Sequence, residues 1–129
     1  MSTHKPFRFS LQSFNTTSPD AWRGLIRKTE DLGYSTFFLA DHFLSEGPAL
    51  EGTYHPPQML AAVPAIAMAL EQTSTLRVGR RVFCNDYRQP VMLAKEAATM
   101  DYLSGGRLEF GLGAGWIKNE YEAAGLAFD

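Results

Sequence analysis

The chain has 129 residues and is 45% hydrophobic, which is sufficient for one domain with a real core. Its 12 basic and 14 acidic side chains give a formal net charge of −2, with no basic stripe typical of a nucleic-acid surface. The longest apolar run, 59–70, is too short to span a bilayer. Because the first residues lack the apolar stretch of a signal peptide and Cys84 is the one cysteine, we expect a cytoplasmic protein without disulfides.

Hydrophobic spacing predicts strands that alternate with helices along the chain. The expected strands are 7–12, 36–40, 76–83 and 108–112, and the expected helices are 18–32, 59–70 and 90–103. Ser18 is a good N-cap for the first helix, and Pro64 either breaks the second helix or makes it start late. This order implies parallel strands joined by right-handed crossovers in a single domain. Both an open doubly wound sheet and part of a (β/α)8 barrel fit it.

Both architectures place their chemistry at the carboxyl ends of the strands. Asp41 and His42 follow the second strand and form the most distinctive pair, because an imidazole exchanges protons near neutral pH and an adjacent carboxylate can orient a ligand. The alternative is structural, with Asp41 capping the loop and His42 partly exposed. His55 lies beside two prolines and is interpreted as structural or exposed. No ligand spacing supports a metal site formed by His42, His55 and Cys84.

The glycines of 111–115 suggest a dinucleotide-binding turn, but Trp116 stands where the third glycine of that motif belongs. They either let a flat or phosphorylated ligand approach the backbone or form a tight turn. Arg80 and Arg81 are adjacent in one strand, so they point to opposite faces and one of them can point inward.

Longer stretches carry a family resemblance. They read NDYRQPVMLAKEAATMD at 85–101 and LSGGRLEFGLGAGW at 103–116, preceded by EDLGY at 30–34 and ADHF at 40–43. With this order and spacing, the chain resembles the luciferase-like monooxygenase superfamily from about residue 7 to 128. The sequence at 41–43 is more similar to the branch that uses coenzyme F-420, a 5-deazaflavin, than to the FMN-dependent branch. The resemblance implies one truncated domain over residues 1–129, the N-terminal half of an α/β (β/α)8 TIM barrel with about four parallel strands and three helices.

The resemblance also implies site residues. His42 matches a proposed catalytic acid near the deazaflavin ring, and Arg81-Val82 matches a non-prolyl cis peptide that forms a bulge against that ring. The other implied cofactor-binding residues are Asp41, Cys84, Asn85, Ala114, Gly115 and Asn119, with no metal. Trp116 departs from the pattern, because it replaces a catalytic glutamate found in a sugar-phosphate dehydrogenase of the family.

The activity implied for the parent enzyme is hydride transfer between coenzyme F-420 and a small organic substrate, with His42 handling a proton and Asp41 orienting the cofactor. Two alternatives remain, namely an FMN-dependent monooxygenase and a non-enzymatic remnant or half-barrel that needs a partner chain. We expect neither a nucleic-acid nor a membrane partner. Four strands cannot close a barrel, so we expect a homo-oligomer or association through the open face. The inward side chains are expected to include some of Phe37, Leu39, Val78, Val82, Phe110 and Leu112.

Overall fold

The structure is a computed structural model that describes residues 7–128. Its four strands form one parallel sheet in the order β1-β2-β3-β4. The strands are β1 (Ser10–Ser13), β2 (Thr36–Leu39), β3 (Arg77–Cys84) and β4 (Leu108–Gly113). Each strand therefore pairs with the next one along the chain, as in a barrel. A doubly wound sheet reverses its strand order at a switch point, so that alternative is excluded.

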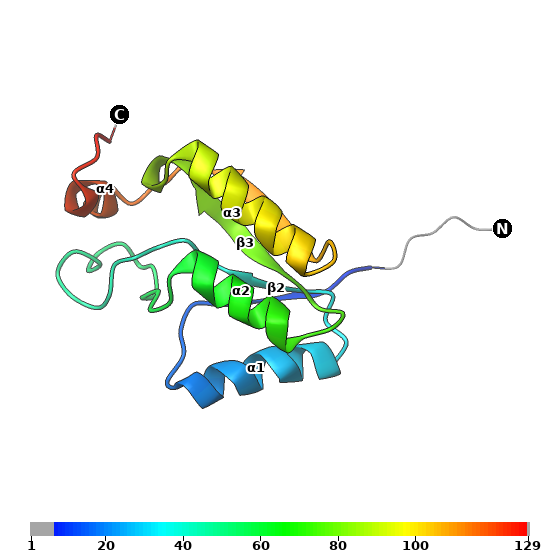
Figure 1. The fold of residues 1–129 in the computed structure, drawn as a ribbon. Coiled ribbons are helices and arrows are strands. Elements are labelled where there is room, and N and C mark those ends of the chain that lie inside the picture. Colours follow the sequence, from blue (N-terminus) through cyan, green and yellow to red (C-terminus); the bar gives the residue numbers. More distant parts are fainter. Residues whose placement is uncertain (1–6, 129) are drawn as a thin grey trace.

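Three long helices follow the first three strands and cover one face of the sheet (Figure 1). They are α1 (Pro19–Asp31), α2 (Ala62–Gln72) and α3 (Pro90–Leu103). The side chain of Ser18 caps α1 as predicted, accepting the N–H of Ala21 at 3.0 Å. Pro64 lies in the first turn of α2, so it does not break the helix; the helix instead starts later than the predicted residue 59. No helix within residues 7–128 is long and apolar enough to cross a membrane.

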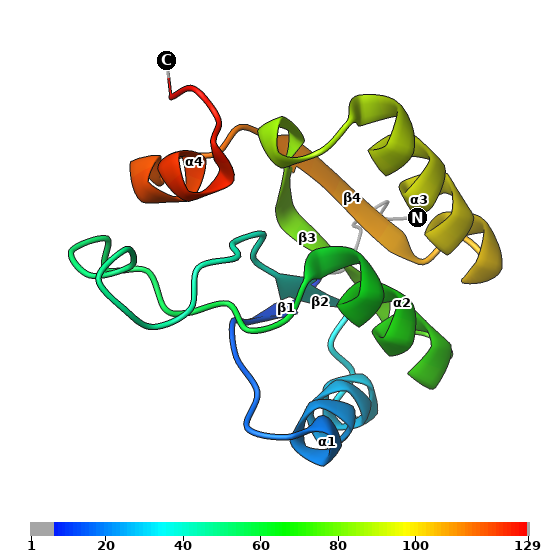
Figure 2. The ribbon, with the colours of Figure 1, turned by 60° about the vertical axis from the view of Figure 1, so that its left-hand side comes forward.

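Two further elements were not predicted. A 3-10 turn, η1 (Asn85–Tyr87), follows β3, and a fourth helix, α4 (Lys118–Ala124), follows β4. The expectation of three helices was therefore one short. Figure 2 shows α4 at the same end of the sheet as the long loop that connects β2 to α2. This is the carboxyl end of the strands, where chemistry was expected.

From the sequence, some of six apolar strand side chains were expected to point inward, and among these six the structure supports this for Val82. Phe37, Leu39 and Val78 are at most 1% exposed and belong to the core beneath the helices. Phe110 packs on Phe83 of that core, with ring centroids 5.3 Å apart, and Leu112 shares its face by alternation. Alternation separates two faces without saying which one the helices cover. Here the helices bury Phe37, Leu39 and Val78, whereas Phe110 and Leu112 lie on the same face of the last strand but stay exposed. We call the opposite side the inner face.

Val82 lies on the inner face. A Cβ built on Gly111 or Gly113 would meet its side chain at 3.0 or 2.6 Å, and these glycines alternate with Phe110 and Leu112. The peptide bond between Arg81 and Val82 is cis, as the resemblance implied. The β3–β4 pairing shifts register between Arg80 and Phe83, which forms the expected bulge.

Candidate active site at the carboxyl ends of the strands

A cavity of about 110 Å³ lies where the residues that end or follow β2, β3 and β4 meet. Seven of the predicted site residues line it, together with Tyr87 and Trp116: they are Asp41, His42, Arg81, Val82, Cys84, Ala114 and Gly115. The other two lie outside its lining. Asn85 begins η1, and the side-chain amide of Asn119 in α4 donates to the backbone oxygen of Ala49 at 2.6 Å. The structure therefore brings most of the predicted residues together at one place.

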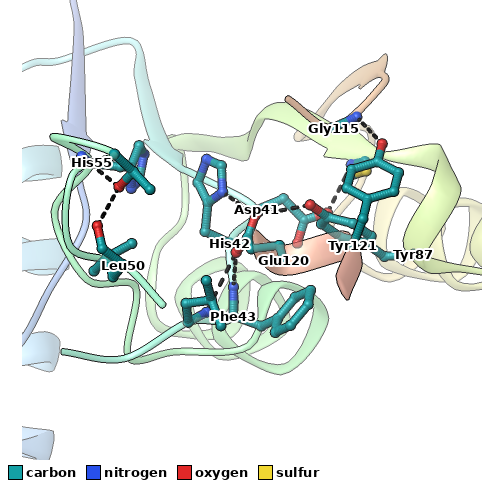
Figure 3. Close-up of polar contacts among 12 residues, drawn as sticks. Asp41, His42, Phe43, Leu50, His55, Tyr87, Gly115, Glu120 and Tyr121 are labelled. Atoms are coloured by element: carbon teal, nitrogen blue, oxygen red, sulfur yellow. Dashed lines mark hydrogen bonds and ion pairs between the residues drawn. The ribbon is translucent and has the colours of Figure 1, made fainter. Parts of the chain in front are cut away.

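The imidazole of His42 is held by a glutamate from the last helix (Figure 3). Its Nδ1 lies 2.7 Å from Oε2 of Glu120, whose side chain is fully buried. An ionised carboxylate only accepts hydrogen bonds, so Nδ1 carries the proton in this pair. The Nε2 atom is therefore the nitrogen that His42 has available for a reacting group.

Glu120 was missed by the sequence analysis, although it organises this end of the barrel. Besides His42, its carboxylate accepts the N–H of Phe43 at 2.8 Å and the hydroxyl of Tyr87 at 2.9 Å. Burial opposes its ionisation, but the hydrogen bonds from His42, Phe43 and Tyr87 outweigh burial and hold the pKa of Glu120 below its ordinary value. Burial, together with the hydrogen bond to Glu120, raises the pKa of Tyr87. Glu120 is therefore an anion at neutral pH and Tyr87 is a neutral donor to it.

The ring of His55, interpreted from the sequence as structural or exposed, is half-buried and lies against that of His42. The two ring centroids are 3.9 Å apart. Trp116 meets both rings edge-on at 5.9 and 6.0 Å, and Phe14, just after β1, meets His55 at 5.3 Å. His55 and Trp116 thus pack directly against the ring of His42, and Phe14 packs behind His55.

Asp41, which also lines the cavity, binds three protein groups. Its carboxylate accepts the N–H of Cys84 at 2.9 Å and forms a two-pronged ion pair with Arg88. Arg80 approaches it at 3.2 Å. The side chain of Asp41 is only 6% exposed, so both its oxygens are already held by the protein. Asp41 therefore holds Arg80, Arg88 and the end of β3 in position.

Arg80 and Arg81 point to opposite faces, as predicted. Arg80 is fully buried beneath the helices, 5.9 Å from the ring centroid of Phe83, whereas Arg81 lines the cavity. Burial lowers the pKa of Arg80 to about 10, and the charge of Asp41 opposes that shift. Arg80 therefore stays charged at neutral pH and needs Asp41 as its counter-ion.

The three glycines after residue 110 are explained by protein contacts. Gly111 and Gly113 leave room for Val82, while a Cβ on Gly115 would meet the ring of Tyr121 at 2.5 Å. The sequence allowed two interpretations of these glycines, close approach of a ligand and a tight turn, and neither included these contacts with other side chains. Within residues 7–128, no group of three or more His, Cys, Asp or Glu side chains is placed to hold a metal ion.

The fold and this cavity define the first half of a parallel α/β barrel with a site at the carboxyl ends of its strands. Residues 3–129 match the luciferase-like monooxygenase family, and the chain belongs to that family.

Three relatives illustrate the range of activities. The chain is 34% identical over 99 residues to an F-420-dependent glucose-6-phosphate dehydrogenase of Amycolatopsis mediterranei (strain U-32), covering 76% of the chain and 28% of that protein. It is 32% identical over 107 residues to the 4-hydroxyprotoasukamycin monooxygenase of Streptomyces nodosus subsp. asukaensis, covering 81% of the chain and 26% of that protein. The chain superimposes on the solved structure of the coenzyme F-420-dependent tetrahydromethanopterin reductase of Methanopyrus kandleri with a TM-score of 0.72 at 26% identity. The match covers 94% of the chain and 30% of that protein. The chain thus spans less than a third of each relative.

Proposed function

We propose that this chain is the N-terminal half of a (β/α)8 oxidoreductase that transfers a hydride between coenzyme F-420 and a small organic substrate. The observation that carries the proposal is the pair of His42 and Glu120. Because Glu120 fixes Nδ1 at 2.7 Å, His42 presents Nε2 as a proton donor or acceptor at the edge of the cavity. Hydride transfer to or from a carbon–oxygen bond requires such a proton on the oxygen.

The cavity residues fit a flat conjugated ring. Val82 is 36% exposed and Trp116 is 56% exposed, so both present apolar surface beside His42. When bound there, the deazaflavin would supply the hydride chemistry. Val82, Cys84 and Ala114 would contact the ring, and Asp41 would keep this wall in position through Arg88 and Arg80.

The rest of the cofactor requires strands beyond the four described. In (β/α)8 barrels the phosphate-binding loops commonly follow the seventh and eighth strands. We therefore propose that the site is completed by further strands, contributed either by the same polypeptide or by a partner chain. The similarity to relatives more than three times as long as the matched region supports this arrangement.

An FMN-dependent monooxygenase is the second candidate. Trp116 is the observation that favours it. This residue stands in the cavity where a sugar-phosphate dehydrogenase of the family has a catalytic glutamate, and an indole has no carboxyl group that could give or take a proton. The similarity to the 4-hydroxyprotoasukamycin monooxygenase also supports this alternative.

Fluorescence titration of the whole protein with F-420 and with FMN tests the proposal. We expect tighter binding of F-420, and tighter binding of FMN would favour the monooxygenase.

Two substitutions test the cavity itself. Val82→Asp should weaken cofactor binding, whereas Val91→Asp, at a 74% exposed position on α3, should not. His42→Ala should lower turnover by roughly 10²-fold or more. A protein that binds neither compound would support the non-enzymatic alternative.

A further inference from the structure

We propose that His55 is a second functional histidine, which passes a proton between Nε2 of His42 and solvent. The inference deepens the proposed function and rests on it for the identity of the reaction. It starts from the 3.9 Å between the two ring centroids, a contact that brings together residues 13 positions apart in the chain.

The hydrogen bonds of the two rings leave the same atom free on each. Nδ1 of His42 binds Glu120, and Nδ1 of His55 lies 2.7 Å from the backbone oxygen of Pro56. A carbonyl oxygen only accepts, so Nδ1 of His55 carries a proton and its Nε2 holds a lone pair. Each ring can therefore gain or lose its mobile proton at Nε2 while keeping its anchor.

His55 lies in a loop between two exposed residues, Tyr54 and Pro56. Both histidines are half-buried residues, and the side chain of His42 is 11% exposed and is covered by Glu120 and Trp116. A substrate over His42 would close that residue off from water. The half-buried ring of His55 then offers the route by which the proton is exchanged.

The loop that carries His55 is built to hold its ring in place. The backbone N–H of His55 donates to Oγ1 of Thr53 at 3.2 Å, and that hydroxyl donates to the backbone oxygen of Leu50 at 2.7 Å. Tyr54, immediately before His55, has a left-handed φ of 55°, although its own side chain is fully exposed. Such a conformation is unusual for a bulky residue and persists where the surroundings favour it. Here it turns the chain so that His55 faces His42.

The step balances as a simple proton transfer. When Nε2 of His42 has given its proton to the reacting oxygen, Nε2 of His55 takes a proton from water and passes it to Nε2 of His42, directly or through one water. In the opposite direction the same proton leaves through His55. No electron moves, and both Nδ1 protons stay on their anchors.

Two positive rings at this separation repel each other, so the pair favours a single extra proton. Burial and the nearby charge of His42 lower the pKa of His55, consistent with this. The other ionisable groups that face the pair or line the same cavity are Glu120, Tyr87, Asp41, Arg81 and Cys84.

The first test does not depend on cofactor. Histidine side chains of the isotope-labelled whole protein are titrated by NMR in the wild type, His42→Gln and His55→Gln. We expect His55 to titrate at higher pH in His42→Gln than in the wild type, because the charge of the neighbouring ring is gone; His55→Gln identifies the His55 signal. If His55 titrates identically with and without His42, the two rings are not coupled and the inference is overturned.

The second test measures turnover with the cofactor that binds. His55→Ala should lower kcat by about 10-fold or more with little change in KM, and added imidazole should restore part of it. Glu51→Gln, an exposed change in the same loop, is the matched control. An unchanged kcat in His55→Ala, even with a shifted titration of the pair, would mean that His55 is not the proton route. A loss of kcat that added imidazole does not restore would mean the same. Failure of cofactor binding would overturn the proposed function and leave the titration result unaffected.

Discussion

The hydroxyl of Tyr121 accepts a hydrogen bond from the backbone N–H of Gly115 at 2.9 Å, and its ring occupies the space that a side chain at position 115 would need. The same hydroxyl donates to Asp86 in η1, a contact that raises the pKa of Tyr121 to about 12. Tyr121 therefore joins α4 to the segments that follow β3 and β4. Because α4 also carries Glu120, this contact fixes the partner of His42.

Gly115→Ala should displace α4. The new Cβ would lie 2.5 Å from Cε2 and from the hydroxyl oxygen of Tyr121, so we expect a loss of about 1–3 kcal/mol in the free energy of unfolding. Urea unfolding of the whole protein measures it. The matched control is Gly24→Ala in the exposed face of α1, where nothing lies within 4 Å of the new Cβ and helix propensity predicts a gain of about 0.5–1 kcal/mol. Equal effects of the two changes would contradict the proposed clash.

Glu30 should contribute stability that depends on pH. Its Oε1 accepts the N–H groups of Ser74, Thr75 and Leu76 at 2.6–3.0 Å, tying α1 to the turn before β3. Burial opposes ionisation, but these hydrogen bonds outweigh it and lower the pKa of Glu30 to about 2. A lowered folded-state pKa means that the contribution is complete above the ordinary value of 4.5 and is lost as pH falls from there toward 2.

Glu30→Gln should therefore cost about 2 kcal/mol at neutral pH, the range for hydrogen bonds to a charged group. The difference from wild type should shrink as the pH falls below the ordinary pKa of a glutamate. Unfolding free energies measured across that pH range give both values. Asp31→Asn, at the exposed neighbouring position, serves as the control. A cost for Glu30→Gln that is constant with pH would show that the carboxylate charge is not its source.

Asp41→Asn should strongly destabilise the barrel. Arg80 is fully buried and lies 3.2 Å from Asp41, and the neutral amide would leave Arg80 and Arg88 without a counter-ion. Removing one partner of a buried ion pair costs about 3–5 kcal/mol. The exposed pair of Asp20 and Arg23 is the comparison, and Asp20→Asn should cost no more than about 1 kcal/mol. Thermal unfolding that ranks the two variants equally would contradict the structural role of Asp41.

The sequence predicted the parts of this fold that have a regular period. The strands and the helices before residue 104 were found because their apolar residues recur over many positions, and α3 was predicted with its observed bounds. The helix α4 has seven residues, too few for a helical period to be distinctive, so Glu120 was overlooked. Its contact with His42 joins residues 78 positions apart. The contact between His42 and His55 depends on an irregular loop, for which periodicity gives no signal.

The open edges of the sheet lead to a prediction for residues 1–129 expressed alone. Within the described residues β1 pairs only with β2 and β4 only with β3, so each strand has one free edge. Phe110 and Leu112 on β4 are 46% and 54% exposed. Exposed strand edges with apolar side chains favour pairing with another chain. Full burial of each such side chain contributes about 1.5–3 kcal/mol, a substantial part of the roughly 5–15 kcal/mol that stabilises a domain.

We therefore expect this chain on its own to self-associate through β4 and the inner face, and to bind F-420 more weakly than the whole protein does. Size-exclusion chromatography with light scattering measures the association. Phe110→Lys should reduce it, because a charge on an exposed edge strand opposes edge-to-edge pairing, whereas Val91→Lys on the helical surface should leave it unchanged. A folded monomer that binds F-420 as tightly as the whole protein would show that four strands complete the site without further barrel, which contradicts the proposal that later strands supply the remaining contacts.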